Sequence, residues 1–257
     1  MAKEAVKEVE VKNVSMTFGS GAGSVEALNN VSFDVEKNEF VSIVGPSGCG
    51  KSTLLRIIMG LQKPTQGYVT VNGKKVERPM REMSMAFQDP TLLKWRTVMD
   101  NVLLPIETLK LKKEDYRKQA QELIELVGLK GFEKFYPEEL SGGMRARVAV
   151  CRCLITNPEI VLMDEPFGPL DALTRLTMDF ELLRIRHEQR KTFIFVTHDV
   201  EESVFLSDRV IVMSCRPGCV QDIVEIDLPR PRSPAVRASR KFVKYSTHIL
   251  RELGVER

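Results

Sequence analysis

The chain has 257 residues, 43% hydrophobic and 28% charged, which suits one large α/β domain or a core with an inserted subdomain. The net charge of +3 is too small to indicate nucleic-acid binding, and no apolar run approaches the roughly 18 residues of a membrane span. Five cysteines without zinc-finger spacing, and an amino terminus without an apolar signal core, lead us to expect a reduced cytosolic protein.

The first 80 residues are expected to be rich in strands. Apolar and polar residues alternate in VEVKNVSMTF (9–18) and NNVSFDVEKNE (29–39), and Asn72-Gly73 predicts a hairpin turn. FVSIVG (40–45) is a short apolar run that predicts a buried parallel strand, as do EIVLMDE (159–165) and TFIFVTHD (192–199). Each of the last two runs ends in polar residues, at the edge where open parallel sheets bind ligands.

A phosphate-binding loop follows the first buried strand. The pattern G-x-x-x-x-G-K-[ST] predicts a glycine-rich turn whose backbone N–H groups and helix start surround phosphate oxygens. Lys51 would reach the β and γ phosphates of ATP, and the Ser52 hydroxyl would ligate Mg²⁺. Next to Lys51 and a helix start, Cys49 is expected to be a thiolate whose alkylation blocks ATP binding. The ATP-binding loop comprises Gly45, Pro46, Ser47, Gly48, Cys49, Gly50, Lys51, Ser52 and Thr53.

Residues from about 90 to 157 are expected to be helical. Helices are predicted over 114–128 and from Ser141 to Ile155, the second capped by the Ser141 hydroxyl. Gly142 and Gly143 stand just inside that second helix, where each costs roughly 1 kcal/mol against alanine. Their presence suggests that another group comes very close to the backbone there.

Three polar residues end the later buried strands. Asp164 would hold Mg²⁺, and Glu165 would act as general base toward the attacking water. His198 would bond the γ-phosphate and help orient the water, although a lone histidine in this position is more often structural. His187 and His248 are expected to face solvent.

The order of these motifs resembles the ATP-binding subunit of ABC transporters: GPSGCGKST, Gln88, LSGGM, IVLMDEP, PLDA (169–172) and His198. The resemblance implies that Phe18 stacks on adenine and that Gln88 senses Mg²⁺ and links the ATP site to the membrane subunits. It also implies a head-to-tail homodimer, in which Ser141, Gly142, Gly143 and Met144 contact the ATP held by the sister copy and Asp171 connects the two sites. The glycines would then be tolerated because a side chain would block that approach.

Two residues depart from the family pattern. Met144 stands where glutamine is usual after Ser-Gly-Gly, and Pro169 stands where alanine is common. Met144 should have little effect, whereas Pro169 stiffens its loop and is expected to alter coupling between the two sites modestly.

The segment FQDPTLLKWRTVMDNVLLP resembles the nitrate, sulfonate and taurine group of importers, as does LPRPRSP (228–234). Such subunits work under two membrane permeases, with a solute-binding protein as an indirect partner and no nucleic acid. Leu92, Leu93 and Trp95 would contact the permease; alternatively, Trp95 packs inside the helical subdomain. The subunit would lie on the cytoplasmic side of the membrane. The ATPase of an exporter or lipid-trafficking complex, or a non-transport ABC ATPase, remains an alternative.

These elements predict an α/β fold: a P-loop NTPase (RecA-like) core with an N-terminal antiparallel β subdomain and an inserted α-helical subdomain at about 90–157. We assign residues 1–214 to an ABC ATPase domain and residues 215–257 to a strand and a basic helical tail. That tail is expected to be a solvated amphipathic helix or to contact acidic lipid headgroups, through the cations Arg230, Arg232, Arg237, Arg240, Lys241 and Lys244.

Overall fold

The computed structural model describes residues 7–255. Outside it lie residues 1–6, which are part of the segment expected to lack a signal core, and the last two residues of the predicted tail. The chain forms two compact units. One comprises the chain up to Met80 and from Arg190 onward; the other comprises Arg81–Gln189. The domain boundaries given above stay predictions. Within residues 7–255, no helix is long and apolar enough to cross a bilayer.

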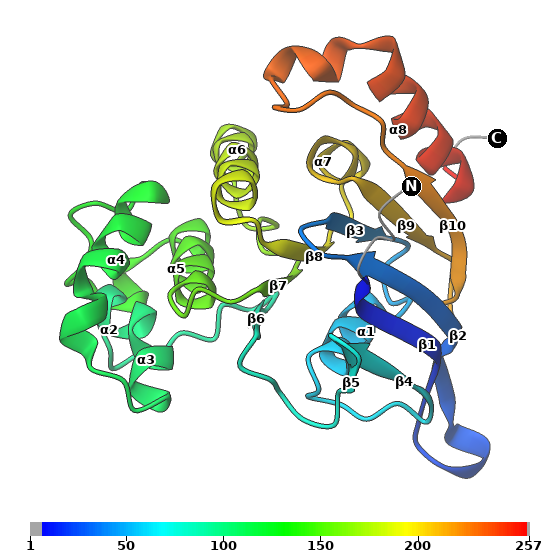
Figure 1. The fold of residues 1–257 in the computed structure, drawn as a ribbon, viewed down its shortest axis with the longest axis horizontal. Helices are drawn as coiled ribbons and strands as arrows, with labels where there is room; N and C mark the ends of the chain where they lie inside the picture. The colour runs from blue at the N-terminus through cyan, green and yellow to red at the C-terminus, as the bar shows by residue number, and fades with distance from the viewer. Residues whose placement is uncertain (1–6, 256–257) are drawn as a thin grey trace. The chain divides into compact units, whose positions relative to one another are not determined.

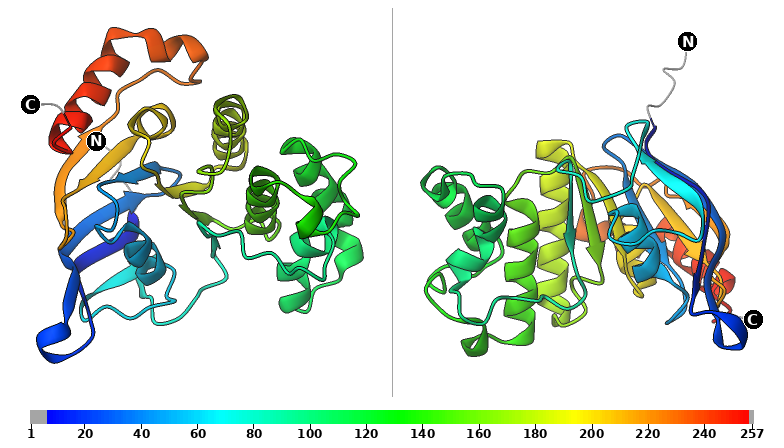
Figure 2. Two further views of the ribbon diagram at one scale, coloured as in Figure 1. Left: turned by 180° about the vertical axis from the view of Figure 1, so that it is seen from behind. Right: turned by 90° about the horizontal axis from the view of Figure 1, so that it is seen from below.

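The first unit contains an antiparallel sheet in the order β2-β1-β4-β5 (Figure 1). Its strands are β1 (Lys7–Phe18), β2 (Val25–Glu36), β4 (Gln66–Val71) and β5 (Lys74–Lys75). Asn72 and Gly73 form the predicted hairpin turn with φ values of 48° and 74°, as a two-residue turn of this kind requires. The connection between β1 and β2, with the short helix η1 (Gly21–Gly23), projects from the end of these strands (Figure 2).

The same unit contains the parallel strands of the core. β3 (Phe40–Val44) lies between β8 (Thr192–Val196) and β9 (Arg209–Met213), parallel to both, and β10 (Val220–Glu225) runs antiparallel to β9. All five residues of β3 and of β8 are buried, as apolar runs without alternation predict. Helix α1 (Lys51–Ile58) lies between this layer and the antiparallel sheet and buries Leu54, Leu55, Ile57 and Ile58 (Figures 1 and 2).

The carboxyl-terminal segment of this unit continues through η3 (Pro234–Ala238) to α8 (Arg240–Glu252), which packs against α7 (Val200–Leu206) and β10 (Figure 1). The helix is amphipathic, as predicted, and buries Phe242 and Ile249. His248 is not simply solvent-facing: it is half-buried and lies 2.8 Å from an Asp222 carboxylate oxygen. That prediction was wrong because helix charge alone does not reveal which strand the helix covers.

The basic tail is also less solvated than expected. Arg232 is buried and donates hydrogen bonds to the carbonyls of Val204, Phe205 and Ser207 at the end of α7, 2.6 to 3.1 Å away. Arginine is suited to a helix carboxyl terminus because its donors meet unpaired carbonyls there. Among residues 7–255, three more tail cations have partners: Arg230 pairs with Asp208, Lys241 pairs with Asp227, and Arg237 lies 4.5 Å from the Phe205 ring centre. Three of the six named cations, Arg230, Arg232 and Arg237, therefore hold the tail to the rest of its unit, whereas Lys241 pairs within the tail.

The second unit contains the parallel strands β6 (Met83–Ala86) and β7 (Ile160–Asp164) with the helices of the middle of the chain. Helix α4 (Lys113–Leu126) and helix α5 (Gly142–Leu154) confirm the two helices predicted there, within one to two residues at each end. Their buried side chains pack with those of α2 (Val98–Val102) and α3 (Leu104–Thr108). The unit also holds η2 (Pro137–Glu139) and α6 (Ala172–Gln189).

Candidate functional site

The phosphate loop of the first unit has a backbone that only glycine satisfies at several positions. Gly48 and Gly50 have φ of +75° and +102°, which side-chain-bearing residues rarely adopt. A Cβ at Gly45 would come within 2.9 Å of the Cys49 sulfur and 3.0 Å of the Met213 carbonyl oxygen. Because Gly50 is the N-cap of α1, no side chain caps this helix start, which suits an anion as the capping group. Around the glycines, Ser47 is exposed, whereas Pro46, Ser52 and Thr53 are half-buried.

Lys51 lies folded over this loop. Its side chain is almost completely buried, and Nζ donates hydrogen bonds to the carbonyl oxygens of Gly45, at 2.8 Å, and Pro46, at 3.0 Å. Within residues 7–255, Lys51 forms no ion pair with a carboxylate, and a buried lysine without such a partner carries a large desolvation penalty. An incoming phosphate would supply the missing negative charge, so the loop fits a nucleotide phosphate.

The predicted reactivity of Cys49 was wrong. Its side chain is 1% exposed, and burial raises the pKa of the Cys49 thiol. The positive charge of Lys51 acts in the opposite direction without cancelling that rise. The local sequence indicated a thiolate because it shows the lysine and the helix start but not the packing that excludes water.

A distant loop between β9 and β10 braces the phosphate loop, a feature that the sequence reasoning missed. Arg216 donates from Nε and from one terminal nitrogen to the carbonyl oxygen of Gly48, at 3.2 and 3.0 Å. Gly218 is pressed so closely against the Cys49 carbonyl that a Cβ would come within 2.0 Å of that oxygen. These contacts join residues that are 168 or more positions apart, and no local pattern around Arg216 signals them.

Two further predicted residues lie in the first unit. His198 is exposed and follows β8, whose Val196 is the register partner of Ile43 in β3. Since β3 and β8 are parallel, His198 leaves the same sheet edge as the phosphate loop. Phe18 ends β1 with 41% of its surface exposed, which leaves its ring accessible for stacking.

In the second unit, the structure brings Gln88 and Glu165 together. They follow the neighbouring parallel strands β6 and β7, and the Gln88 amide donates to a Glu165 carboxylate oxygen at 3.4 Å. Glu165 has φ of +45°, an uncommon backbone state for a residue with a side chain and one that concentrates at functional sites. Asp164, the last residue of β7, is 2% exposed.

The start of α5 shows why one of its two glycines is needed. Ser141 caps the helix as predicted, with its hydroxyl accepting from the Met144 N–H at 3.2 Å. A Cβ at Gly143 would lie 2.9 Å from the Leu170 side chain, so that glycine allows close packing within the same chain. At Gly142, the nearest atom would be 3.8 Å away, on Pro169, which is ordinary contact. Packing inside the chain therefore leaves Gly142 unexplained.

The segment around Pro169 lies against this helix start and leads into α6. Asp171 accepts hydrogen bonds at the beginning of α6, from the N–H groups of Leu173 and Thr174 at 3.1 and 3.0 Å. The Thr174 hydroxyl donates to the other carboxylate oxygen at 2.6 Å, and these bonds lower the pKa of Asp171. Residues 141–144, predicted to contact the ATP of the sister copy, thus adjoin Pro169 and Leu170, which lead to Asp171 in the second unit.

Trp95 is 74% exposed, which excludes the alternative that it packs inside its own unit. Leu92 and Leu93 are half-buried beside it in sequence. The backbone that carries them is held by Asn101, a fully buried side chain that the sequence analysis missed. Its amide accepts from the Leu93 N–H at 2.8 Å and donates to the carbonyls of Leu93, Arg96 and Thr97.

Two arginines also tie this segment to neighbouring helices. Arg96 forms two hydrogen bonds with Glu107, at 2.6 and 3.0 Å, and this pairing, with Lys113, lowers the pKa of Glu107 to about 2. Arg152 of α5 donates to the carbonyls of Pro90 and Thr91, two and three residues after Gln88. The exposed tryptophan is thus presented on an ordered backbone, as an interface anchor requires.

Comparison with known proteins identifies the family. The family model described as "ABC transporter" matches residues 28–168, more than half of the chain. The chain is 48% identical to an uncharacterized ABC transporter ATP-binding protein of Methanocaldococcus jannaschii, over 97% of this chain and 92% of that protein. It is 44% identical to the aliphatic sulfonates import ATP-binding protein SsuB of Bacillus licheniformis, over 91% and 90% of the two chains.

A solved structure supports the same assignment. A dimeric ATP-binding cassette in a post-hydrolysis state, bound to ADP and phosphate, aligns with a TM-score of 0.79 and 34% identity. The alignment covers 86% of this chain and all of that one. The α/β fold is that of a P-loop NTPase core with an antiparallel β subdomain and an inserted helical subdomain, as expected. This chain therefore belongs to the ABC transporter family, as one of its ATP-hydrolysing ATP-binding subunits.

Proposed function

We propose that this subunit powers an importer of a small anionic solute of the nitrate, sulfonate or taurine kind. The observation that carries the proposal is the identity of 40–44% with proteins named as aliphatic sulfonates import subunits, over at least 91% of the chain. The chain's permeases would contribute the membrane spans, and a solute-binding protein would select the solute outside the membrane. In this arrangement the subunit lies at the cytoplasmic face of the membrane.

The roles of the site residues are part of the proposal. Lys51 and the backbone of the phosphate loop hold the ATP phosphates, and Phe18 stacks on adenine. Ser52, Gln88 and Asp164 offer hydroxyl, amide and carboxylate oxygens, the donor types that Mg²⁺ prefers. Bound there, Mg²⁺ would neutralise charge on the phosphates.

Glu165 is the general base in this mechanism. It takes a proton from the water that attacks the γ-phosphorus, and the bond to the bridging oxygen of ADP breaks. The hydrogen bond from Gln88 holds a Glu165 oxygen, so a movement of the Gln88 segment would change the orientation of the base. His198 supports the reaction by donating to the γ-phosphate, and Lys51 stabilises the charge that develops on it.

A second copy of the chain completes the site. Ser141, Gly142, Gly143 and Met144 would present the start of α5 to the γ-phosphate held by the sister copy, with Asp171 nearby to connect the two sites. The solved dimeric cassettes that this chain resembles support a homodimer. The absence of a Cβ at Gly142, which the chain's own packing does not require, agrees with an approach from outside. Hydrolysis would remove the γ-phosphate contacts and allow the dimer to open.

The permease contact is assigned to the surface formed by Leu92, Leu93 and Trp95. An exposed tryptophan on a backbone fixed by Asn101 suits a pocket on a partner helix, because little ordering remains to oppose docking. The matched control is Leu111→Ala, since Leu111 is a 44% exposed leucine of the same unit. Trp95→Ala is expected to keep ATPase activity in the isolated subunit and to lose assembly with the permease, whereas Leu111→Ala keeps both.

The proposal is tested by reconstituting the subunit with its permeases and binding protein in vesicles. We expect ATP-dependent uptake of a sulfonate or a similar small anion. Glu165→Gln is expected to bind ATP normally, to trap an ATP-bound dimer and to abolish turnover, whereas the exposed control Glu188→Gln hydrolyses ATP as the wild type does. If Glu165→Gln still hydrolysed ATP, Glu165 would not be the general base. Export of the solute, or assembly without any membrane protein, would instead contradict the assignment as an importer.

A further inference from the structure

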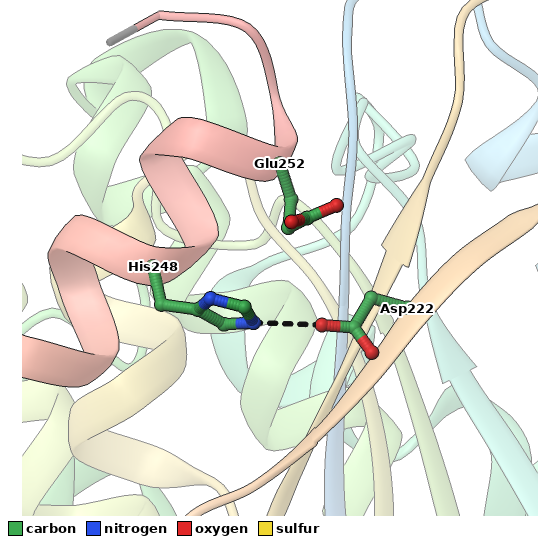
Figure 3. Close-up of side chains that lie close together, drawn as sticks. All are labelled: Asp222, His248 and Glu252. Atoms are coloured by element: carbon green, nitrogen blue, oxygen red, sulfur yellow. Dashed lines mark hydrogen bonds and ion pairs between the residues drawn. The ribbon is translucent and has the colours of Figure 1, made fainter. Parts of the chain in front are cut away.

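A second cluster of metal-ligand side chains lies in the first unit, among elements that the proposed ATPase mechanism does not use. Asp222 of β10 and His248 and Glu252 of α8 converge, and one ligand atom from each lies within 4.8 Å of the others (Figure 3). His248 Nε2 is 2.8 Å from Asp222 Oδ2. All three side chains are half-buried.

The backbones of α8 and β10 explain why these three side chains converge. His248 and Glu252 are four residues apart, so they share one face of α8, the spacing at which helices present paired metal ligands. On β10, the register with β9 shifts between Val220 and Asp222. Such a bulge redirects side chains, and here the consecutive residues Gln221 and Asp222 both reach α8.

Neighbouring groups fix the two carboxylates. The Ile223 N–H donates to Asp222 Oδ1 at 2.8 Å, which leaves Oδ2 toward the cluster. The Gln221 amide donates to the Glu252 carboxylate at 3.2 Å and to its carbonyl at 2.8 Å. Hydrogen bonds to the ligands from such outer groups are a regular feature of metal sites, because they set ligand orientation before the ion binds.

The charge of the cluster calls for a cation. Glu252 is the last residue of α8, where the partial negative charge of the helix end opposes a carboxylate. Within residues 7–255, neither Asp222 nor Glu252 forms an ion pair with a lysine or arginine, and His248 is the only basic partner of Asp222. Lys244 and Arg251 line a hollow that His248 also lines, and neither forms an ion pair with Asp222 or Glu252 within the described residues.

We propose that Asp222, His248 and Glu252 bind a divalent transition-metal ion, with Zn²⁺ the preferred occupant. One imidazole and two carboxylates are borderline-hard ligands that suit Zn²⁺, and three protein ligands leave a fourth position for water. The ion links α8 to β10 and so fastens the carboxyl-terminal segment to the core. Its role is separate from that of the Mg²⁺ assigned to the ATP site.

The test is a titration of the full-length, nucleotide-free, chelator-treated protein with Zn²⁺ by calorimetry and with Co²⁺ by visible absorption. Every sample carries Cys215→Ser, because the exposed thiol of Cys215 is itself a metal ligand. We expect one ion per chain and a higher melting temperature with Zn²⁺. His248→Gln is expected to weaken binding by more than the roughly 10–100-fold that loss of an outer-shell partner costs.

His187→Gln is the matched control, since His187 is an exposed helical histidine outside the cluster. It is expected to bind as the parent does. Asp222→Asn supplies a second variant if His248→Gln unfolds, because asparagine keeps the size of the side chain and loses the charge. Equal Zn²⁺ binding by parent and Asp222→Asn, with both folded by circular dichroism, would sink the proposal. No saturable binding by the parent would leave the His248–Asp222 contact as an ion pair only and would also overturn it.

Discussion

The molecule contains two glycine-rich helix starts, and they differ in what their glycines are for. At the phosphate loop, Gly50 has a left-handed backbone, and a Cβ there would lie 2.7 Å from the Leu28 side chain. At the start of α5, Gly142 has neither a positive φ nor a close neighbour in its own chain. The first glycine is required by the fold of one copy. The second is a cost to one copy, which suggests that its purpose lies in a partner.

The largest expected effect follows from the first helix start. Gly50→Ala places a Cβ against Leu28 and the Ala27 carbonyl and forces a left-handed backbone, so the free energy of unfolding should fall by about 2–4 kcal/mol. ATP binding should be lost with it. Urea unfolding and nucleotide titration measure the two effects.

Gly73→Ala is the control for Gly50→Ala. Gly73 has a similar φ of +74° and no neighbour within 4 Å. Its substitution by alanine should therefore lower the free energy of unfolding only through the left-handed backbone, by about 1–2 kcal/mol, and should keep ATP binding. Equal losses of stability in the two variants would show that packing around Gly50 contributes nothing.

At the second helix start, we expect a substitution that keeps stability but removes dimerisation and turnover. Gly142→Ala should leave the free energy of unfolding unchanged or raise it by up to about 1 kcal/mol, because alanine is the better helix former and meets no close atom. ATP-driven dimerisation and turnover should nevertheless be lost, while the single copy still binds ATP.

The test introduces Gly142→Ala into the Glu165→Gln variant. Urea unfolding then measures stability, nucleotide titration measures ATP binding, and light scattering with ATP measures dimerisation. The control variant, with Gly73→Ala and Glu165→Gln, should still form the dimer. A Gly142→Ala chain that dimerises normally would show that no partner group approaches this glycine.

How far the sequence anticipates each region depends on whether its contacts are local. The phosphate loop, the hairpin at Asn72-Gly73 and the Ser141 cap are predictable because a few consecutive residues determine them. The close contact of Gly143 with Leu170, the partners of Arg216 and the burial of Arg232 arise where distant segments meet. Cys49 shows both limits, since its charged neighbour is visible in the sequence and its burial is not.

A smaller effect tests whether the phosphate loop depends on its brace. Arg216→Gln removes the charged donors to the Gly48 carbonyl, so ATP affinity should fall by up to about tenfold, corresponding to roughly 1.4 kcal/mol, an upper value for exposed bonds. Arg240→Gln, at an exposed arginine of α8, should change neither affinity nor stability.

Arg216→Lys distinguishes positioning from charge. Lysine keeps the positive charge near the phosphates but lacks the paired planar donors of arginine. If Arg216 positions the loop, Arg216→Lys should resemble Arg216→Gln in its ATP affinity. Full recovery with lysine would mean that the residue acts on the nucleotide through its charge alone.

The smallest expected effect is on the pH dependence of stability, and it comes from buried thiols rather than from an exposed one. Burial raises the pKa of the thiols of Cys49 and Cys151, whereas Cys215 is exposed. The unfolded chain releases these two protons near the ordinary thiol pKa of about 8.5, and the folded chain retains them to higher pH. Their contribution to stability is therefore complete below that pKa and declines as the pH rises above it.

Urea unfolding at a series of alkaline pH values measures this decline in the free energy of unfolding. The decline should be shallower in the Cys49→Ala, Cys151→Ala double variant than in Cys215→Ala, in which both buried thiols remain. A neutral alkylating reagent should label Cys215 in the native chain and reach the buried pair only after unfolding. Rapid native labelling of Cys49 would mean that the phosphate loop opens to solvent. The contrast between a self-contained helix start and one that awaits a partner would then no longer hold.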